Sequence, residues 1–189
     1  MKAMYESVPR LGLFMLCSAV FFYLSRKSLS KPHSHGFARF FAWEAILALF
    51  LINVPYWFED RFSPKQLLSW LLLFCSLYLL VHGAYLLQVA GKPGPVRDGE
   101  ELFGFEKTSV LVQNGIYRYI RHPLYASLLF LAWGIFLKLP TWIGGLLSVS
   151  ASLLLWITAK HDESECVDFF GDEYRNYMSG TRMFIPFLF

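Results

Sequence analysis

The chain has 189 residues, of which 56% are hydrophobic, 19% are aromatic and only 16% are charged. A mean hydropathy of +0.42 and long apolar runs exclude an ordinary soluble domain and indicate an integral membrane protein. The net charge of +3 is small and the basic residues are not clustered, which argues against binding of nucleic acid. The three cysteines have neither metal-binding nor disulfide spacing, so we expect no metal site.

Five apolar segments predict about five transmembrane helices in an all-α fold. They cover residues 8–24, 37–57, 66–89, 124–139 and 141–159. A helix needs about 20 residues to cross the hydrocarbon core, so the second and third segments are long enough and the other three are short. Pro140 separates the last two segments and predicts a tight helical hairpin. The first segment has no cleavage site after it and is interpreted as a retained helix.

We expect a single membrane domain over residues 1–189. It divides into three N-terminal spans (1–89), a cytoplasmic loop (90–123), the helical hairpin (124–159) and a tail (160–189). The tail is predicted to form a cytoplasmic amphipathic helix.

The distribution of lysine and arginine predicts the orientation in the membrane. Five of the 17 basic residues lie on the side of the N-terminus, namely Lys2, Arg10, Arg61, Lys65 and Lys138. The other twelve lie on the side of the long loop and the tail. The positive-inside rule therefore places the N-terminus outside and the C-terminus in the cytoplasm. The membrane would be the inner membrane of a bacterium, or the endoplasmic reticulum of a eukaryote.

The predicted tail helix carries an unusual acid. Val167, Phe170, Tyr174 and Tyr177 recur at steps of three and four, and extending this apolar stripe backward by one turn reaches Glu163. A carboxylate on a buried stripe is costly unless it has a partner. Glu163 is therefore either a ligand-binding group, a helix-start acid favoured by the dipole, or the partner of a basic neighbour.

The stretch G-I-Y-R-Y-I-R-H-P-L-Y lies where the polar loop meets the fourth apolar segment. Pro123 suits the first turn of a helix, whose positive end would face the cytoplasm and attract an anion. Arg121 offers a planar fork for a carboxylate, and His122 can donate or accept a proton near neutral pH. Tyr117 and Tyr125 add aromatic faces for a cation or an adenine. The alternative is a juxtamembrane anchor without ligand.

This stretch resembles the G-x-Y-x-x-x-R-H-P-x-Y signature of isoprenylcysteine carboxyl methyltransferases and the related phospholipid methyltransferases. The sequence D-E-S-E-C-V-D-F-F-G-D-E-Y-R-N-Y resembles their acidic pair followed by F-G-x-E-Y-x-x-Y, and T-R-M-F-I-P resembles their closing R-x-x-P. The three motifs follow the family's order and cover residues 109–186. The resemblance implies an integral-membrane enzyme that uses S-adenosylmethionine.

The resemblance also implies which residues contact this cofactor. They are Leu111, Val112, Tyr117, His122, Pro123, Leu124, Tyr125, Asp162 and Glu163. Two departures from the family pattern stand out. The acidic pair is Asp-Glu where Glu-Glu is usual, and the arginine expected about one turn before the pair is absent, with Thr158 and Ala159 in its place and Lys160 as the nearest base. The second departure argues against a prenylcysteine carboxylate as the substrate, but not against methyl transfer.

Arg121, His122 and Glu163 are the predicted catalytic residues. A carboxylate acceptor needs only a positive clamp, for which Arg121 is the candidate, whereas an amine or thiol must lose a proton to His122 or Glu163. We expect methyl transfer to a hydrophobic or lipid-linked acceptor, with carboxyl O-methylation as the first expectation. The alternatives are N-methylation of a phospholipid amine and a non-catalytic transporter subunit or scaffold. The cofactor would come from the cytosol and the acceptor from the bilayer.

Two ionisable residues lie within the predicted spans. Glu44 and His82 are each about seven residues from the cytoplasmic end of their segments, hence roughly 10 Å deep. They could meet, either to line the site or as a structural pair that joins two helices. Asn53 lies deeper and is predicted to make a hydrogen bond between helices.

Overall fold

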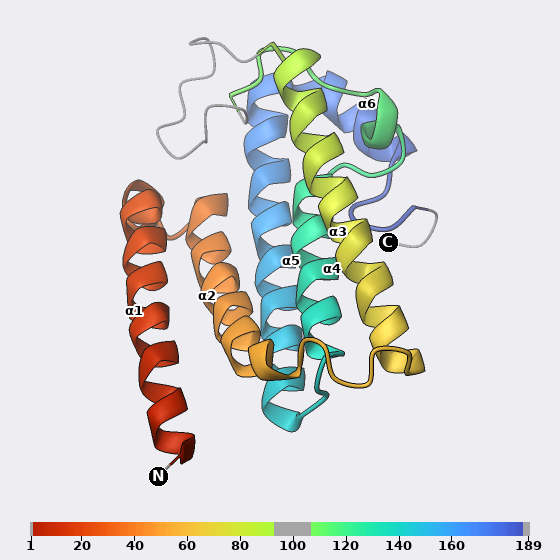
Figure 1. The fold of residues 1–189 in the computed structure, drawn as a ribbon. Coiled ribbons are helices and arrows are strands. Elements are labelled where there is room, and N and C mark those ends of the chain that lie inside the picture. The colour runs from red at the N-terminus through yellow and green to blue at the C-terminus, as the bar shows by residue number, and fades with distance from the viewer. Residues whose placement is uncertain (1, 93–106, 187–189) are drawn as a thin grey trace.

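The computed structural model describes residues 2–92 and 107–186, and every regular element among them is a helix (Figure 1). The predicted all-α integral-membrane fold is confirmed. The α-helices are α1 (Lys2–Leu29), α2 (His35–Asn53), α3 (Pro64–Val89), α4 (Pro123–Phe136), α5 (Trp142–Phe170) and α6 (Asp172–Gly180). Two short 3₁₀ helices, η1 (Val54–Tyr56) and η3 (Gly115–Arg118), extend α2 and precede α4.

Four helices of the described chain are long and apolar enough to cross a membrane. They are α1, α2 together with η1, α3 and α5, whereas α4 has only 14 residues. The expectation that the first and last spans are short was wrong, because α1 and α5 have 28 and 29 residues. Both helices continue through charged residues, since lysine, arginine and glutamate are good helix formers. The number of crossings and the orientation stay predictions.

The boundary between the last span and the tail lies later than predicted. No break occurs at residue 160; α5 continues to Phe170 and ends at Gly171, whose φ of +61° favours glycine. The predicted tail helix is therefore divided between the end of α5 and the short α6. Asp162 and Glu163 consequently lie on the last turns of a long, packed helix.

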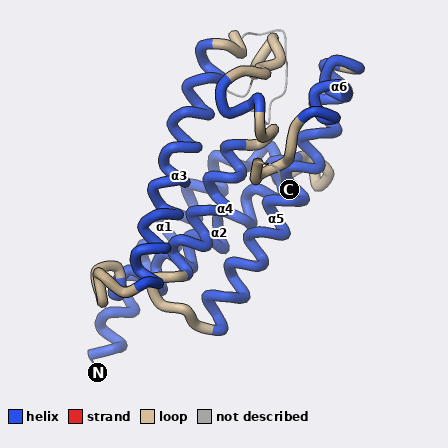
Figure 2. Tube along the Cα trace, turned by 90° about the vertical axis from the view of Figure 1, so that its right-hand side faces the viewer, coloured by secondary structure: helices blue, strands red, loops and turns tan. Residues whose placement is uncertain are grey.

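The helices form a bundle in which α4 lies between α3 and α5, and α2 packs along α5 (Figures 1 and 2). Small residues join α3 to α4, as is common between membrane helices. Ser69 Oγ donates to the carbonyl of Gly134 at 2.7 Å, and Gly83 lies directly against Pro123 and Leu124. The second contact places the first turn of α4, and thus the R-H-P corner, beside the end of α3.

Buried polar groups tie the bundle together at the end far from this corner. Lys138 is only 1% exposed; its Nζ donates to Gln66 Oε1 at 3.1 Å and lies 3.7 Å from the ring centroid of Trp70. Asn53 Oδ1 accepts from the backbone N–H of Leu139 at 3.1 Å. These contacts hold the turn between α4 and α5 to the ends of α2 and α3.

Glu44 and His82 have separate partners. Ser18 Oγ of α1 donates a hydrogen bond to Glu44, while His82 stacks on Tyr78 of its own helix with ring centroids 5.4 Å apart. The hypothesis that the two ionisable residues meet was therefore wrong, because α4 and α5 lie between the helices that carry them (Figure 1).

The seam between α3 and α4 predicts a difference between two glycines. A Cβ at Gly134 would lie 3.0 Å from Leu73 side-chain atoms and 3.3 Å from its backbone nitrogen, whereas a Cβ at Gly145 would meet nothing closer than 3.7 Å. We expect Gly134→Val to lower the free energy of unfolding by about 1–3 kcal/mol through overpacking, and Gly145→Val to be close to neutral. Thermal unfolding in detergent, followed by tryptophan fluorescence, measures both; equal losses in the two variants would contradict the described packing.

Candidate functional site

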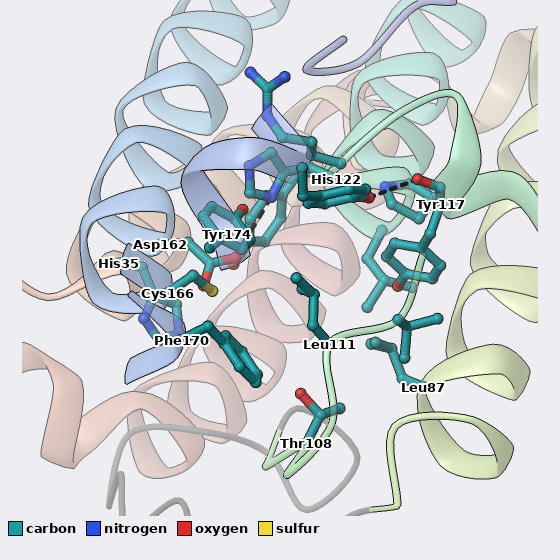
Figure 3. Close-up of a pocket in the computed structure, with 16 residues that line it drawn as sticks. His35, Leu87, Thr108, Leu111, Tyr117, His122, Asp162, Cys166, Phe170 and Tyr174 are labelled. Atoms are coloured by element: carbon teal, nitrogen blue, oxygen red, sulfur yellow. Dashed lines mark hydrogen bonds and ion pairs between the residues drawn. The ribbon is translucent and has the colours of Figure 1, made fainter. Parts of the chain in front are cut away.

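The first two motifs converge on one cavity at the end of the bundle formed by α3, α4 and α5 (Figure 3), and the third packs against the first. Eight of the nine residues implied as cofactor contacts line it, namely Leu111, Val112, Tyr117, His122, Pro123, Leu124, Tyr125 and Asp162. Arg121 also contributes to the wall. The ninth residue, Glu163, lies behind the wall, where it contacts both Arg121 and His122.

Backbone hydrogen bonds join the first motif to the third. The N–H of Arg121 donates to the carbonyl of Arg182 at 2.8 Å, and the N–H of His122 donates to the carbonyl of Met183 at 3.1 Å. In return, the N–H of Arg182 donates to the carbonyl of Tyr119 at 3.1 Å. The closing T-R-M-F-I-P segment thus forms a short parallel bridge with the corner, and this bridge holds the start of α4 in place.

A buried ion pair joins the first motif to the second. Both Nε and Nη2 of Arg121 lie 2.8 Å from Glu163 Oε1, and Lys160 Nζ lies 3.0 Å from Glu163 Oε2. Nη1 of Arg121 donates to the carbonyls of Met178 and Thr181, where a cation is favourable because these groups lie at the end of α6. The fork of Arg121 is therefore engaged within the protein, and Glu163 has basic neighbours as partners.

His122 lies between the two acids of the pair. Its Nδ1 is 3.5 Å from Asp162 Oδ2 and its Nε2 is 3.5 Å from Glu163 Oε1, and Tyr125 stacks on the ring with centroids 5.4 Å apart. Burial alone lowers the pKa of His122, but hydrogen bonds and charge from the two carboxylates outweigh it, so the pKa is raised above its ordinary value. His122 thus holds its proton more firmly than a free imidazole.

Aromatic rings form much of the remaining wall. Phe170, Tyr174 and Tyr177 come from the end of α5 and from α6, opposite Tyr117, and Tyr177 donates to the carbonyl of Tyr117 at 2.6 Å. Burial raises the pKa of Tyr174 and of Tyr177 well above the ordinary value, so both phenols stay neutral. These rings offer electron-rich faces, and Asp162 supplies an acid at the cavity wall.

The chemistry of this wall fits S-adenosylmethionine. Aromatic faces suit a sulfonium and an adenine, and the Asp162 carboxylate suits an ammonium or the hydroxyls of a ribose. His122, at the N-cap of α4, suits a carboxylate, because a helix N-terminus and a protonated imidazole both attract anions.

Sequence reasoning missed seven residues that line the cavity: His35, Leu87, Thr108, Cys166, Phe170, Tyr174 and Tyr177. The last three belong to the predicted apolar stripe but were not predicted as cofactor contacts. Cys166 follows Asp162 by one helical turn, a spacing that places both on one face, so the sequence did hold a signal for it. His35 begins α2 and belongs to no motif. Only its position on the predicted cytoplasmic side could have pointed to it.

The family model described as "Phospholipid methyltransferase" matches residues 65–173. The chain belongs to the phospholipid methyltransferase family. The recognition made from the motifs is therefore confirmed. No solved structure matches this member of the family.

Three curated relatives resemble this family member. Methanethiol S-methyltransferase 1 of Bradyrhizobium diazoefficiens is 26% identical over 171 residues, which cover 84% of this chain and 56% of the relative. Protein-S-isoprenylcysteine O-methyltransferase of Schizosaccharomyces pombe is 36% identical over 88 residues, covering 43% of this chain and 35% of the relative. Methanethiol S-methyltransferase of Pseudomonas deceptionensis is 27% identical over 122 residues, covering 64% and 43%. The matched regions thus span about a third to just over half of these relatives.

The buried pair predicts strong coupling between its two members. Replacing Glu163 by Leu, or Arg121 by Met, leaves one charge buried without its partner, and we expect each single change to cost about 3–5 kcal/mol of stability. The double replacement should cost clearly less than the sum of the two, because neither member of the pair is then left buried without the other. A double-mutant cycle of thermal unfolding in detergent measures this; strictly additive losses would show that the pair is not coupled.

His122 predicts a pH-dependent contribution to stability. Because its pKa is raised above 6.5 in the folded protein, its protonated form stabilises the fold fully below pH 6.5, and this stabilisation is lost as pH rises through the raised pKa. We therefore expect the stability difference between the wild type and His122→Asn to be largest near about pH 6 and to shrink toward about pH 9. Thermal unfolding across this range measures the difference; a gap that grows with pH would contradict the direction of the shift.

Proposed function

We propose that the protein is an S-adenosylmethionine-dependent methyltransferase that acts on a hydrophobic acceptor at the membrane. The observation that carries this proposal is the convergence of two motifs from separate parts of the chain, residues 115–125 and 162–177, around one cavity with aromatic and acidic walls. Membership of the phospholipid methyltransferase family and the named activities of the relatives support the same reaction class.

Each part of the cofactor has a proposed partner in the wall. Tyr117, Tyr125 and Tyr174 would take the sulfonium and adenine, His122 the carboxylate, and Asp162 the ammonium or ribose. When bound, S-adenosylmethionine supplies an electrophilic methyl group. The cavity has a volume of about 90 Å³, less than the roughly 300 Å³ or more that ligand sites of this class occupy. The aromatic side chains must therefore move apart on binding.

Arg121 and Glu163 act in this proposal as positioning residues. Their ion pair holds the R-H-P corner against α5 and thereby keeps His122 and Asp162 on the same wall. Glu163 does not line the cavity, so its effect on the reaction would pass through Arg121 and His122.

The contacts that Arg121 already makes within the protein bear on which acceptor the site can bind. A carboxylate acceptor requires a free cation, but the Arg121 fork contacts Glu163 and the carbonyls of Met178 and Thr181, and Thr158 and Ala159 stand where the family's arginine is expected. A neutral thiol or amine needs no such clamp. We therefore favour a thiol acceptor over carboxyl O-methylation, with the phospholipid amine as the second candidate; the methanethiol methyltransferases among the relatives support this order.

The membrane setting gives the two substrates separate routes. We propose that the corner, the end of α5 and α6 face the cytosol, as the basic residues predict, so that the soluble cofactor enters from that side. The hydrophobic acceptor would partition into the bilayer and reach the cavity laterally between helices. A single domain over residues 1–189 would then serve both substrates.

Binding of S-adenosylhomocysteine tests the cofactor site. We expect isothermal titration of the purified protein in detergent to show binding, and Asp162→Asn to weaken it about 10-fold or more, since a hydrogen bond to a charged group contributes about 1.5–3 kcal/mol. Asp168→Asn, an exposed acid on the same helix, is the matched control and should bind as the wild type does. Absence of binding in both detergent and lipid would overturn the proposed function.

Transfer of a labelled methyl group identifies the acceptor. We expect label to pass to an alkanethiol, giving a base-stable thioether, and less or none to a prenylcysteine carboxylate, whose methyl ester would be released by base. Label that enters phospholipid and resists base would favour the amine instead. Cofactor binding without transfer to any of the three would favour a non-catalytic scaffold.

A further inference from the structure

His35 is a buried histidine that the proposed function has not yet used. It is the first residue of α2, is 1% exposed and lines the cavity. Figure 3 places its ring on the side of the cavity that carries Asp162, Cys166 and Phe170. The α1–α2 turn thus supplies a titratable group to a site otherwise built from the second half of the chain.

Glu165 determines how the proton is placed on this ring. His35 Nδ1 lies 2.7 Å from Glu165 Oε2, and the backbone N–H of His35 donates to Glu165 Oε1 at 3.1 Å. An ionised carboxylate only accepts hydrogen bonds, so Nδ1 must carry a proton, and in the neutral imidazole Nε2 then presents a lone pair. The same carboxylate also satisfies the N-terminus of α2, where a negative charge is favourable.

The lone pair on Nε2 has no partner within the described parts of the chain. Nε2 is buried and makes no hydrogen bond, which is unusual for a buried polar atom and leaves it available to a bound molecule. The charged groups around the ring are Asp162 and Glu165 from α5 and Arg39 from the next turn of α2. An oxygen of Asp162 lies within 4.8 Å of a ring nitrogen of His35, so the ring faces the same acid as the proposed cofactor site.

His122, the base predicted from sequence, is less suited to this role. Both of its nitrogens face carboxylates at 3.5 Å, so a proton on either nitrogen has an acid beside it, whereas the 2.7 Å contact of His35 to Glu165 engages Nδ1 alone. A protonated imidazole between two acids holds an anion or an acid in place, but cannot accept a further proton. Nε2 is buried without a hydrogen bond in both rings, but in His122 it faces the Glu163 carboxylate at 3.5 Å, so the Nε2 of His35 is the one left for an acceptor's proton.

We propose that His35, oriented by Glu165, is the general base that removes the proton from a thiol acceptor. This inference rests on the proposed methyl transfer. The acceptor's sulfur forms its bond to the methyl carbon as its proton moves to Nε2, and the bond from that carbon to the sulfonium breaks with its electron pair left on the donor sulfur. The products are a thioether, neutral S-adenosylhomocysteine and a histidinium that Glu165 stabilises. Glu165 is one-third exposed, so the proton can then leave to solvent.

Three variants test the proposal with matched controls. We expect His35→Gln to lower kcat for an alkanethiol about 10²–10⁴-fold, while the affinity for S-adenosylhomocysteine, measured by titration calorimetry, stays within about 2-fold of the wild type. Glu165→Gln, which keeps an acceptor oxygen but loses the charge, should lower kcat at least about 10-fold. His33→Gln, an exposed histidine two residues away, should leave kcat unchanged.

The acidity of the acceptor separates a base from a simple contact. An aromatic thiol that is already ionised at neutral pH needs no base, so His35→Gln should lose little activity with it while losing most activity with the alkanethiol. Equal losses with both thiols would overturn the proposal. So would unchanged kcat with a large loss of cofactor affinity, which would make His35 a cofactor contact only.

A measurement without catalysis examines the same geometry. ¹⁵N NMR of histidine-labelled protein, with the His35 signals assigned by their loss in His35→Gln, should show Nδ1 protonated and Nε2 unprotonated at neutral pH. The opposite tautomer would overturn the proposal even if a variant failed to fold. A wild-type protein that transfers methyl groups to no acceptor would instead overturn the proposed function, whatever the NMR result.

Discussion

The buried contact between Arg121 and Glu163 is the constraint on which the rest of the site depends. It joins the segment before α4 to the last turns of α5, and through Nη1 it also reaches the end of α6. Two charges at this depth are costly to desolvate unless each is fully paired, so the arrangement leaves little freedom for either side chain. The position of the cavity wall follows, because His122 and Asp162 are the immediate neighbours of this pair along the chain.

In the segment before α4 and in the last turns of α5, neighbouring residues have different roles, one in stability and one at the cavity. Glu163 turns into the protein and Asp162 toward the cavity. Arg121 and His122 both line the cavity, but the fork of Arg121 is engaged by Glu163 and the end of α6. The same alternation extends to Glu165, which faces α2 and orients His35. One turn of α5 thus organises three different elements around a single space, which explains why a carboxylate-rich helix end is kept in an apolar chain.

The sequence was sufficient for those parts of the molecule that depend on local signals. Hydropathy predicted the spans, Pro123 predicted the start of α4, and the motif resemblance grouped the residues of Leu111 to Tyr125 with Asp162. It failed where long-range packing decides. Gly171 is a local stop signal for a helix, but the apolar stripe predicted across it, from Val167 to Tyr174, gave no reason to end a helix there. Nor could periodicity show that His35, 130 residues before Glu165, is the partner of that acid.

In the proposed reaction, the length of α4 would determine how deep in the membrane the site lies. A helix of 14 residues rises about 21 Å, whereas the hydrocarbon core is roughly 30 Å thick. If the turn between α4 and α5 at Lys138 lies near one membrane interface, the opposite end of α4 falls about 9 Å short of the other interface. The proline that begins it would then sit below the headgroups, at the level of the upper acyl chains. A hydrophobic acceptor dissolved in the bilayer could then react without entering water, whereas the polar methyl donor would have to enter the membrane to reach it.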